Sequence, residues 1–183
     1  MIGPKAYIDL NRLKQNIWNI RRNIGERNLM IVVKANGYGH GALNIAKHLS
    51  DEPGVIFCVF TIDEAIELRN GGINNSILIF SRIQKDWLKL AYEHKLWINA
   101  CHLDDLELLD HFYSEYGFCP NVHLKFDTGM TRLGFDCNDT HKVFGFLADH
   151  DYLPFIGIYS HFATADEGDL SYAESQLLEF KKI

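Results

Sequence analysis

The sequence has no apolar run that approaches the roughly 20 residues a membrane-spanning helix needs, and residues 1–5 do not begin an apolar signal segment. It also has no excess of positive charge. The formal net charge of −6 provides no electrostatic footprint for nucleic acid or for an anionic membrane surface. These absences predict a cytoplasmic protein whose partners include neither a nucleic acid nor a membrane.

Cysteine pairs at metal-ligand or redox spacing are absent too. No Cys-x-x-Cys occurs, and the histidines outside the motifs discussed below have no metal-ligand spacing, so we predict no metal site. Widely spaced cysteines are typical of reduced, packed thiols in a cytosolic protein. The chain has four of them: Cys58, Cys101, Cys119 and Cys137.

What the sequence does contain is an unbroken alternation of strand-like and helix-like segments. A short strand over Ala6–Leu10 and a helix over Arg12–Ile24, capped by Asp9 or Asn11, come first. Six strands then alternate with six helices. This pattern favours parallel strands with right-handed helical crossovers.

The boundaries of these segments follow from turn residues and helix caps. Thr61, with Glu64 three residues later, has the pattern of a capping box at the start of a helix. The predicted strands are 30–33, 55–60, 76–80, 96–100, 122–126 and 155–159. The helices that follow them are 42–49, 62–70, 85–94, 104–116, 140–150 and a last one from about 170.

Six strand–helix units are fewer than the eight of a closed (β/α)8 barrel, which typically has about 250 residues. An open sheet of six units is one way to accommodate them, as a doubly wound fold. The chain stops at Ile183 in a helical segment without a capping glycine, and no linker divides it. These features favour an incomplete barrel in one domain, 1–183. The exposed edges of its first and sixth strands are then an association hazard.

The chemically most informative stretch is 31–41, where a short apolar run ends at Lys34 and three glycines, Tyr38 and His40 follow. A lysine at the mouth of an α/β fold is partly desolvated. Desolvation lowers the pKa of a lysine and makes its amine a nucleophile toward carbonyl compounds. The pattern therefore predicts Schiff-base chemistry at Lys34. The alternative is a lysine that extends its charge into water, followed by a tight turn.

A second stretch, 123–135, also places polar side chains at a strand end. His123, Lys125 and Asp127 share one face of the strand, because side chains alternate with a period of two. Arg132 lies on the loop beyond the carboxyl end of the strand, where the active sites of barrels are built. The alternative is a solvated lysine–aspartate pair beside an ordinary surface arginine.

These stretches, together with 158–166, resemble the motifs of one family, the alanine racemases. The residues around Lys34 resemble its pyridoxal-phosphate attachment motif. Residues 125–135 resemble Lys-x-Asp-Thr-Gly-Met-x-Arg-Leu-Gly-Phe, and residues 160–166 resemble Ser-His-Phe-Ala-x-Ala-Asp. Thr131 stands where the family often has glycine, and because threonine disfavours a positive φ, we expect the loop to differ slightly there.

The resemblance implies a fold and a role for each matching residue. The fold is an α/β, pyridoxal-phosphate-binding, TIM-like (β/α)8 barrel, here incomplete. Lys34 carries pyridoxal 5′-phosphate as an internal aldimine, and Tyr38 bonds the cofactor phosphate. Arg132 reaches the cofactor's phenolic oxygen and helps to seat the substrate carboxylate. Lys125 matches a lysine that is carbamylated in many members, and His161 packs near the cofactor ring.

Racemisation needs an acid–base group on each face of a planar carbanion. The resemblance implies that Lys34 is the base for the D-enantiomer. The opposite base is a tyrosine of a C-terminal β-domain, contributed by the partner subunit of a homodimer. That domain lies outside this sequence, so we expect an N-terminal fragment that is inactive alone and holds the cofactor weakly.

The full-length enzyme would interconvert L-alanine and D-alanine for the cell wall. Two alternatives stay open. One is a barrel-type amino-acid decarboxylase, whose lysine motif also contains Val-Lys-Ala-Asn. The other is a non-catalytic, single-domain pyridoxal-phosphate carrier, a class that suits the short length of the chain.

Overall fold

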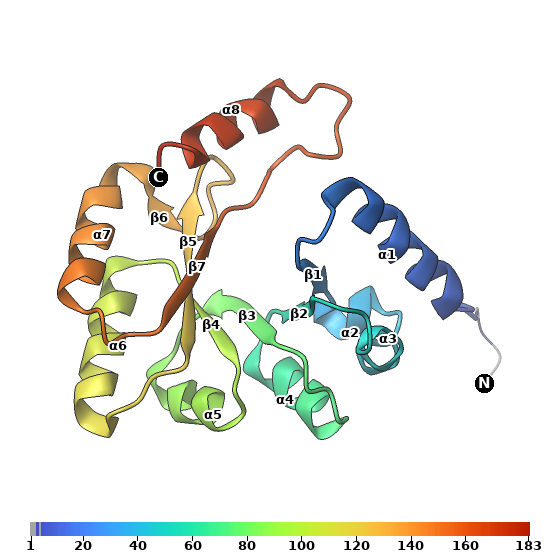
Figure 1. Cartoon of the computed structure of the whole chain (residues 1–183), viewed down its shortest axis with the longest axis horizontal. Coiled ribbons are helices and arrows are strands. Elements are labelled where there is room, and N and C mark those ends of the chain that lie inside the picture. Colours follow the sequence, from blue (N-terminus) through green and yellow to red (C-terminus); the bar gives the residue numbers. More distant parts are fainter. Residues whose placement is uncertain (1–2, 4) are drawn as a thin grey trace. The chain divides into compact units, whose positions relative to one another are not determined.

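A computed structural model of the chain describes residue 3 and residues 5–183. The chain forms two compact units, Met1–Phe80 and Ser81–Ile183. The division falls inside the strand β3 (Ile77–Arg82) and not at a linker. Each unit contains the alternation of strands and helices that the sequence predicts (Figure 1).

In the first unit, three parallel strands carry helices in the connections between them. β1 pairs with β2, and β2 pairs with β3, both in parallel. The central strand β2 is buried along its whole length because it has a partner on each side. The elements are α1 (Leu10–Ile24), β1 (Leu29–Val32), α2 (Lys34–Tyr38), α3 (Ala42–Leu49), β2 (Val55–Val59), α4 (Ile62–Asn70) and the first part of β3.

The beginning of the chain corrects one prediction. Residues Ala6–Asp9 form no strand, and α1 begins at Leu10. The Asp9 side chain accepts a hydrogen bond from the Arg12 N–H at 3.1 Å and caps the helix. Tyr7 is 90% exposed, so its apolar side chain contributes no burial that would hold a strand in place. An alternating pattern without a buried face is insufficient evidence for a strand.

In the second unit, β5 is the central strand. β4, β7 and the short β6 all pair with it in parallel, and its residues 122–126 are buried. The predicted helix 85–94 is instead a 3₁₀ turn followed by a short α-helix. The elements are η1 (Lys85–Trp87), α5 (Leu88–Glu93), β4 (Trp97–Ala100), α6 (Leu103–Tyr116), β5 (Asn121–Asp127), β6 (Phe135–Asp136), η2 (Cys137–Asp139), α7 (Thr140–Asp149), β7 (Phe155–Tyr159) and α8 (Ser171–Phe180).

The helices of the second unit occupy two different places. α6 and α7 flank the strands, whereas α8 lies beyond the carboxyl ends of β5 and β7 (Figure 1). The loops that leave these two strands therefore run between the sheet and α8. This is the end of the sheet at which barrel enzymes build their sites.

Apolar side chains on the outer strand of each unit are partly exposed to solvent. On β1, Met30 and Val32 are 38% and 37% exposed, and on β7, Ile156 and Ile158 are 43% and 41% exposed.

The parallel pairing and the helical connections confirm the predicted α/β class with barrel-type units. Among the described residues, no helix is both long and apolar enough to cross a membrane. Within the same residues, no group of three or more His, Cys, Asp or Glu side chains is arranged to hold a metal ion.

Candidate functional site

The turn that follows β1 and begins at Lys34 is left-handed. Figure 1 labels it α2, but Ala35, Asn36 and Gly37 have φ of 51–62° and ψ of 39–49°, the angles of a left-handed helix. Each such residue with a Cβ costs roughly 1–2 kcal/mol. The Asn36 side chain offsets part of this cost, because its Oδ1 accepts the Ala42 N–H at 2.9 Å, at the start of α3. Backbone strain held in place in this way is frequent at functional sites.

Lys34 itself is half-buried and has two aromatic neighbours. Its Nζ lies 5.9 Å from the centroid of the Tyr38 ring and 5.9 Å from that of the Phe60 ring. Phe60 follows β2, the strand that pairs with β1, so its ring comes from the adjacent strand end. Lys34 therefore stands neither fully in solvent nor fully in the core. Tyr38 is 59% exposed, which leaves its hydroxyl accessible to a ligand.

A carboxylate from α4 holds this turn from the other side. Glu64 Oε1 accepts the Ala35 N–H at 2.6 Å, and Oε2 accepts the N–H groups of Phe60 at 2.7 Å and Thr61 at 3.1 Å. The Thr61 hydroxyl in turn accepts the Glu64 N–H, which confirms the predicted capping box. The bond to Ala35 is additional to a capping box, and it joins the helix to the residue next to Lys34.

In the second unit, Asp127 organises the loop that carries Arg132. Its Oδ1 accepts the N–H groups of Gly129 at 2.9 Å and Thr131 at 3.0 Å, and Oδ2 accepts the Arg132 N–H at 3.0 Å. Partial burial raises the pKa of Asp127, but these donors outweigh it and the net pKa is lowered. Thr131 adopts a φ of 55°, the left-handed conformation that threonine disfavours, and its bond to Asp127 helps to hold it there.

Lys125 and His123 lie on one face of β5, as predicted, and both are buried, at 6% and 9% exposure. The alternative of a solvated lysine is therefore wrong for Lys125. Its Nζ lies 5.9 Å from the Tyr159 ring centroid, in a cation–π contact with the neighbouring strand β7. The His123 ring stacks on Trp97 at 5.1 Å, and burial lowers the pKa of His123.

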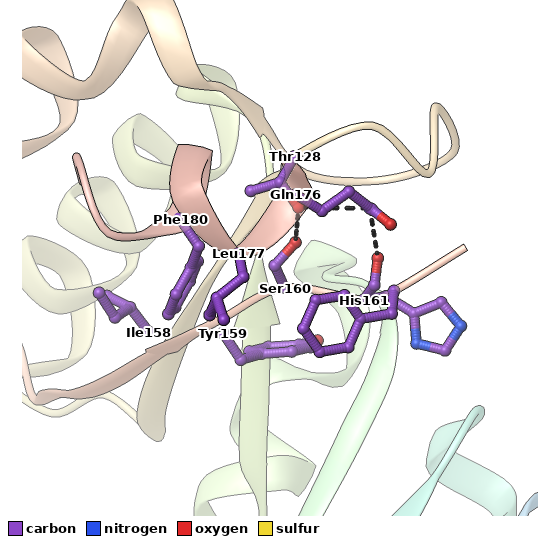
Figure 2. Close-up of a pocket in the computed structure, with 9 residues that line it drawn as sticks. Thr128, Ile158, Tyr159, Ser160, His161, Gln176, Leu177 and Phe180 are labelled. Carbon is purple, nitrogen blue, oxygen red and sulfur yellow. Dashed lines mark hydrogen bonds between the residues drawn. The ribbon is translucent and has the colours of Figure 1, made fainter. Parts of the chain in front are cut away.

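His161 follows β7 at the rim of a cavity of about 290 Å³ (Figure 2). Gln176 of α8, which is 1% exposed, holds this loop through hydrogen bonds to its backbone. Its Nε2 donates to the His161 carbonyl at 3.1 Å, and its Oε1 accepts the Ala163 N–H at 2.9 Å. In Figure 2 the His161 imidazole lies on the side of the cavity away from Ile158 and Phe180. The ring is exposed and accessible to a ligand.

The structure places every predicted site residue at or just after the carboxyl end of a strand, within its own unit. Lys34 and Tyr38 are brought together in the first unit. In the second unit, Lys125 lies on β5, Arg132 on the loop after it and His161 on the loop after β7. A half-buried primary amine beside two aromatic rings and an accessible phenol is a donor set that fits an aldehyde cofactor with an aromatic ring and a phosphate.

The sequence did not predict that three residues hold these loops. Glu64, Asp127 and Gln176 accept or donate bonds to backbone groups next to the predicted site residues. Glu64 is recognisable from the sequence only as a helix cap. An aspartate followed by Gly129 two residues later is a signal for a local turn, but nothing in the sequence points to Gln176.

Comparisons with known proteins identify the family of the chain. A family model described as alanine racemase, N-terminal domain, matches residues 8–183. The alanine racemase of Streptococcus pneumoniae (strain Hungary19A-6) is 40% identical over 182 residues, which cover 98% of this chain and 48% of that protein. That of Halalkalibacterium halodurans is 36% identical over 179 residues, covering 96% of this chain and 46% of that protein.

Solved structures give the same result. An alanine racemase of Clostridium difficile 630 superimposes with a TM-score of 0.86 at 29% identity and covers 97% of this chain and 49% of its own. The chain therefore spans about half the length of the relatives it matches, and its fold is that of part of their barrel. The alanine racemase family depends on pyridoxal phosphate.

Proposed function

The chain belongs to the alanine racemase family, and we propose that the protein that contains it interconverts L-alanine and D-alanine with pyridoxal 5′-phosphate. The observation that supports this most directly is the position of Lys34. A half-buried primary amine stands at a strand end, beside two aromatic rings and directly before a left-handed turn. Such an amine is suited to covalent attachment of an aldehyde.

Lys34 has two tasks in this proposal. Its amine would hold the cofactor aldehyde, and the same amine would move the proton at the substrate α-carbon on the face used by the D-enantiomer. The bound cofactor supplies an electron sink for the carbanion that proton removal creates. The accessible hydroxyl of Tyr38 binds the phosphate. The Phe60 ring, 5.9 Å from Nζ, excludes water from one side of the amine.

The second unit supplies the groups that orient cofactor and substrate. Arg132 binds the substrate carboxylate and the phenolic oxygen of the cofactor, and exposed His161 packs against the cofactor ring. In the proposal, Lys125 is carbamylated, and its carbamate group holds Arg132 in place. Carbamylation would replace a buried cation by an anion, which is the charge that an ion pair with Arg132 requires. Lys125 is 6% exposed, and its Nζ lies beside the Tyr159 ring, so its amine is positioned inside the unit and not in bulk water.

The proposal includes the parts of the reaction that these residues do not supply. In the proposal, a tyrosine of the partner subunit in a homodimer is the acid–base group on the face of the α-carbon opposite Lys34.

We also propose a cytoplasmic location. The four cysteines are all free, and three of them are buried, which suits a reducing compartment.

Exchange of L-alanine and D-alanine, followed by circular dichroism in the protein that contains this chain, tests the proposal. Lys34→Arg keeps the positive charge but provides no amine that forms a Schiff base at neutral pH. We expect it to abolish exchange, whereas Lys47→Arg, an exposed position on α3, leaves the rate unchanged. Exchange by Lys34→Arg at the unsubstituted rate would overturn the proposal.

A further inference from the structure

We infer that Glu64 is a positioning residue for Lys34: its carboxylate fixes the backbone on either side of the amine, and cofactor attachment depends on it. The inference rests on the proposed function of Lys34. Glu64 itself touches neither the amine nor, in the proposal, the cofactor. It acts through Ala35 and Phe60, whose N–H groups it binds at 2.6 and 2.7 Å.

The left-handed turn needs an acceptor from outside itself. Within the segment, the Gly37 N–H donates to the Val33 carbonyl at 2.7 Å, and the Gly39 N–H donates to the Ala35 carbonyl at 3.0 Å. The Ala35 N–H instead donates to Glu64 Oε1. Bonds from a backbone N–H to a carboxylate are charge-assisted and stronger than neutral ones. Without Glu64, the N–H of Ala35, the first left-handed residue of the turn, would lose this acceptor.

The same carboxylate also holds the aromatic neighbour of the amine. Oε2 binds the N–H groups of Phe60 and Thr61, where β2 gives way to α4. The Phe60 ring lies 5.9 Å from Lys34 Nζ. One side chain thus sets the backbone that carries the amine and the position of a ring that flanks it. The strand ends of β1 and β2 are held in register at this point by Glu64 as well as by the ladder.

The alternative is that Glu64 serves only as a helix cap, and another helix of the chain shows how far a shorter carboxylate reaches. Asp105 occupies the equivalent third position of α6. Its Oδ2 accepts the N–H groups of Cys101 and His102, both at 3.0 Å. Oδ2 is the capping oxygen of Asp105, because the other oxygen, Oδ1, accepts the Arg82 Nε–H at 2.7 Å. An aspartate is therefore long enough to bind the residues at a helix start. The longer glutamate reaches one element further, to Ala35.

This comparison gives the test variant. Glu64→Asp keeps the charge and the cap but shortens the side chain by one methylene, which withdraws it from Ala35. Thr61→Ala is the matched control, because it removes the hydroxyl of the capping box and leaves the carboxylate in place. Glu64→Gln is a second variant, which has a single acceptor oxygen for three donors. Asp63→Asn removes a charge from the same helix start without touching the turn.

Two readouts on the intact chain are measured. The first is hydrogen–deuterium exchange of peptides that cover 34–39, without cofactor. The second is the concentration of pyridoxal 5′-phosphate that half-saturates labelling of Lys34 on borohydride reduction. We expect Glu64→Asp and Glu64→Gln to accelerate exchange and to raise that concentration by about tenfold or more. We expect Thr61→Ala and Asp63→Asn to change both by less than about twofold.

Unchanged exchange and labelling in both Glu64 variants would overturn the inference, and so would equal effects from Thr61→Ala, because Glu64 would then act only as a cap. Failure of the proposed function has a different signature. In that case the unsubstituted chain itself is not labelled at Lys34, while the exchange of peptides 34–39 still reports whether Glu64 holds the turn.

Discussion

Gln176 donates a hydrogen bond from Nε2 to the backbone carbonyl of His161, with the two atoms 3.1 Å apart. The same nitrogen lies 3.4 Å from the Thr128 hydroxyl oxygen, and the amide oxygen accepts the Ala163 N–H. One buried side chain of α8 therefore joins the loop after β7 to the end of β5 (Figure 2). The position of His161 depends on a residue 15 positions further along the chain.

Gln176→Leu keeps the side-chain volume close to that of glutamine and removes all three bonds. The Ala163 N–H and the His161 carbonyl then lose their partners in a partly buried place, and we expect the free energy of unfolding to fall by about 1–3 kcal/mol. Urea denaturation measures the change. Glu174→Gln, at an exposed position of the same helix, is the control and is expected to leave the midpoint unchanged. Equal midpoints for the two variants would contradict the role of Gln176.

Gly134 allows the loop that carries Arg132 to return beside β5. It has a φ of +145°, and a Cβ at this position would lie 2.6 Å from the carbonyl carbon of Phe126. We expect Gly134→Ala to destabilise the chain by about 3 kcal/mol, because the clash is with backbone and the conformation is strained for any side chain. Gly145→Ala, in the middle of α7 with open space around it, is expected to stabilise by about 0.5–1 kcal/mol. Thermal unfolding compares the two, and a neutral Gly134→Ala would refute the close approach.

Asp127 gives the stability of the second unit a pH dependence. Burial raises the folded-state pKa of Asp127 from the usual 3.8, but backbone N–H donors outweigh this effect, so the net pKa is lowered. A lowered pKa stabilises the fold at pH above the usual value, and this contribution is lost as the pH falls through the folded-state pKa. In Asp127→Asn, the side chain at position 127 does not ionise. The difference in melting temperature between the two proteins should therefore be constant above about pH 5 and shrink at lower pH. A constant difference down to pH 2.5 would contradict the assignment.

The buried cysteines are expected to be unreactive in the folded chain. Burial raises the pKa of the Cys58 and Cys119 thiols to about 12, and burial, followed by the charge of a neighbouring aspartate, does the same for Cys101. The thiolate is the reactive form. At pH 8, iodoacetamide should modify half-buried Cys137 first and the other three only after unfolding in urea. Peptide mapping identifies the modified sites, and rapid modification of Cys58 in the native chain would contradict its burial.

Local sequence signals predicted much of the fold. The helices Ala42–Leu49 and Ile62–Asn70 and the strand Phe155–Tyr159 have the predicted bounds, because the apolar periodicity that defines each one lies within the segment. Such local signals did not predict the left-handed turn after Lys34. Its angles depend on Glu64, 29 residues from Ala35, and therefore on the pairing of β1 with β2.

The same distinction applies to the candidate site. Motif strings located Lys34, Arg132 and His161 at strand ends, as the structure confirms. Their supporting residues come from other elements of the same unit, and Gln176 lies on a helix whose sequence has no chemical motif. The carbamylation of Lys125 and the roles of the site residues toward cofactor and substrate stay predictions.

In the proposed function, Lys34 binds pyridoxal 5′-phosphate as a Schiff base. Incubation of the chain with the cofactor, reduction with borohydride and peptide mapping by mass spectrometry test this claim most directly. We predict that the phosphopyridoxyl label is on Lys34 and that Lys34→Arg removes it, while Lys47→Arg does not. A label distributed over exposed lysines, or retained at the same level in Lys34→Arg, would contradict the account.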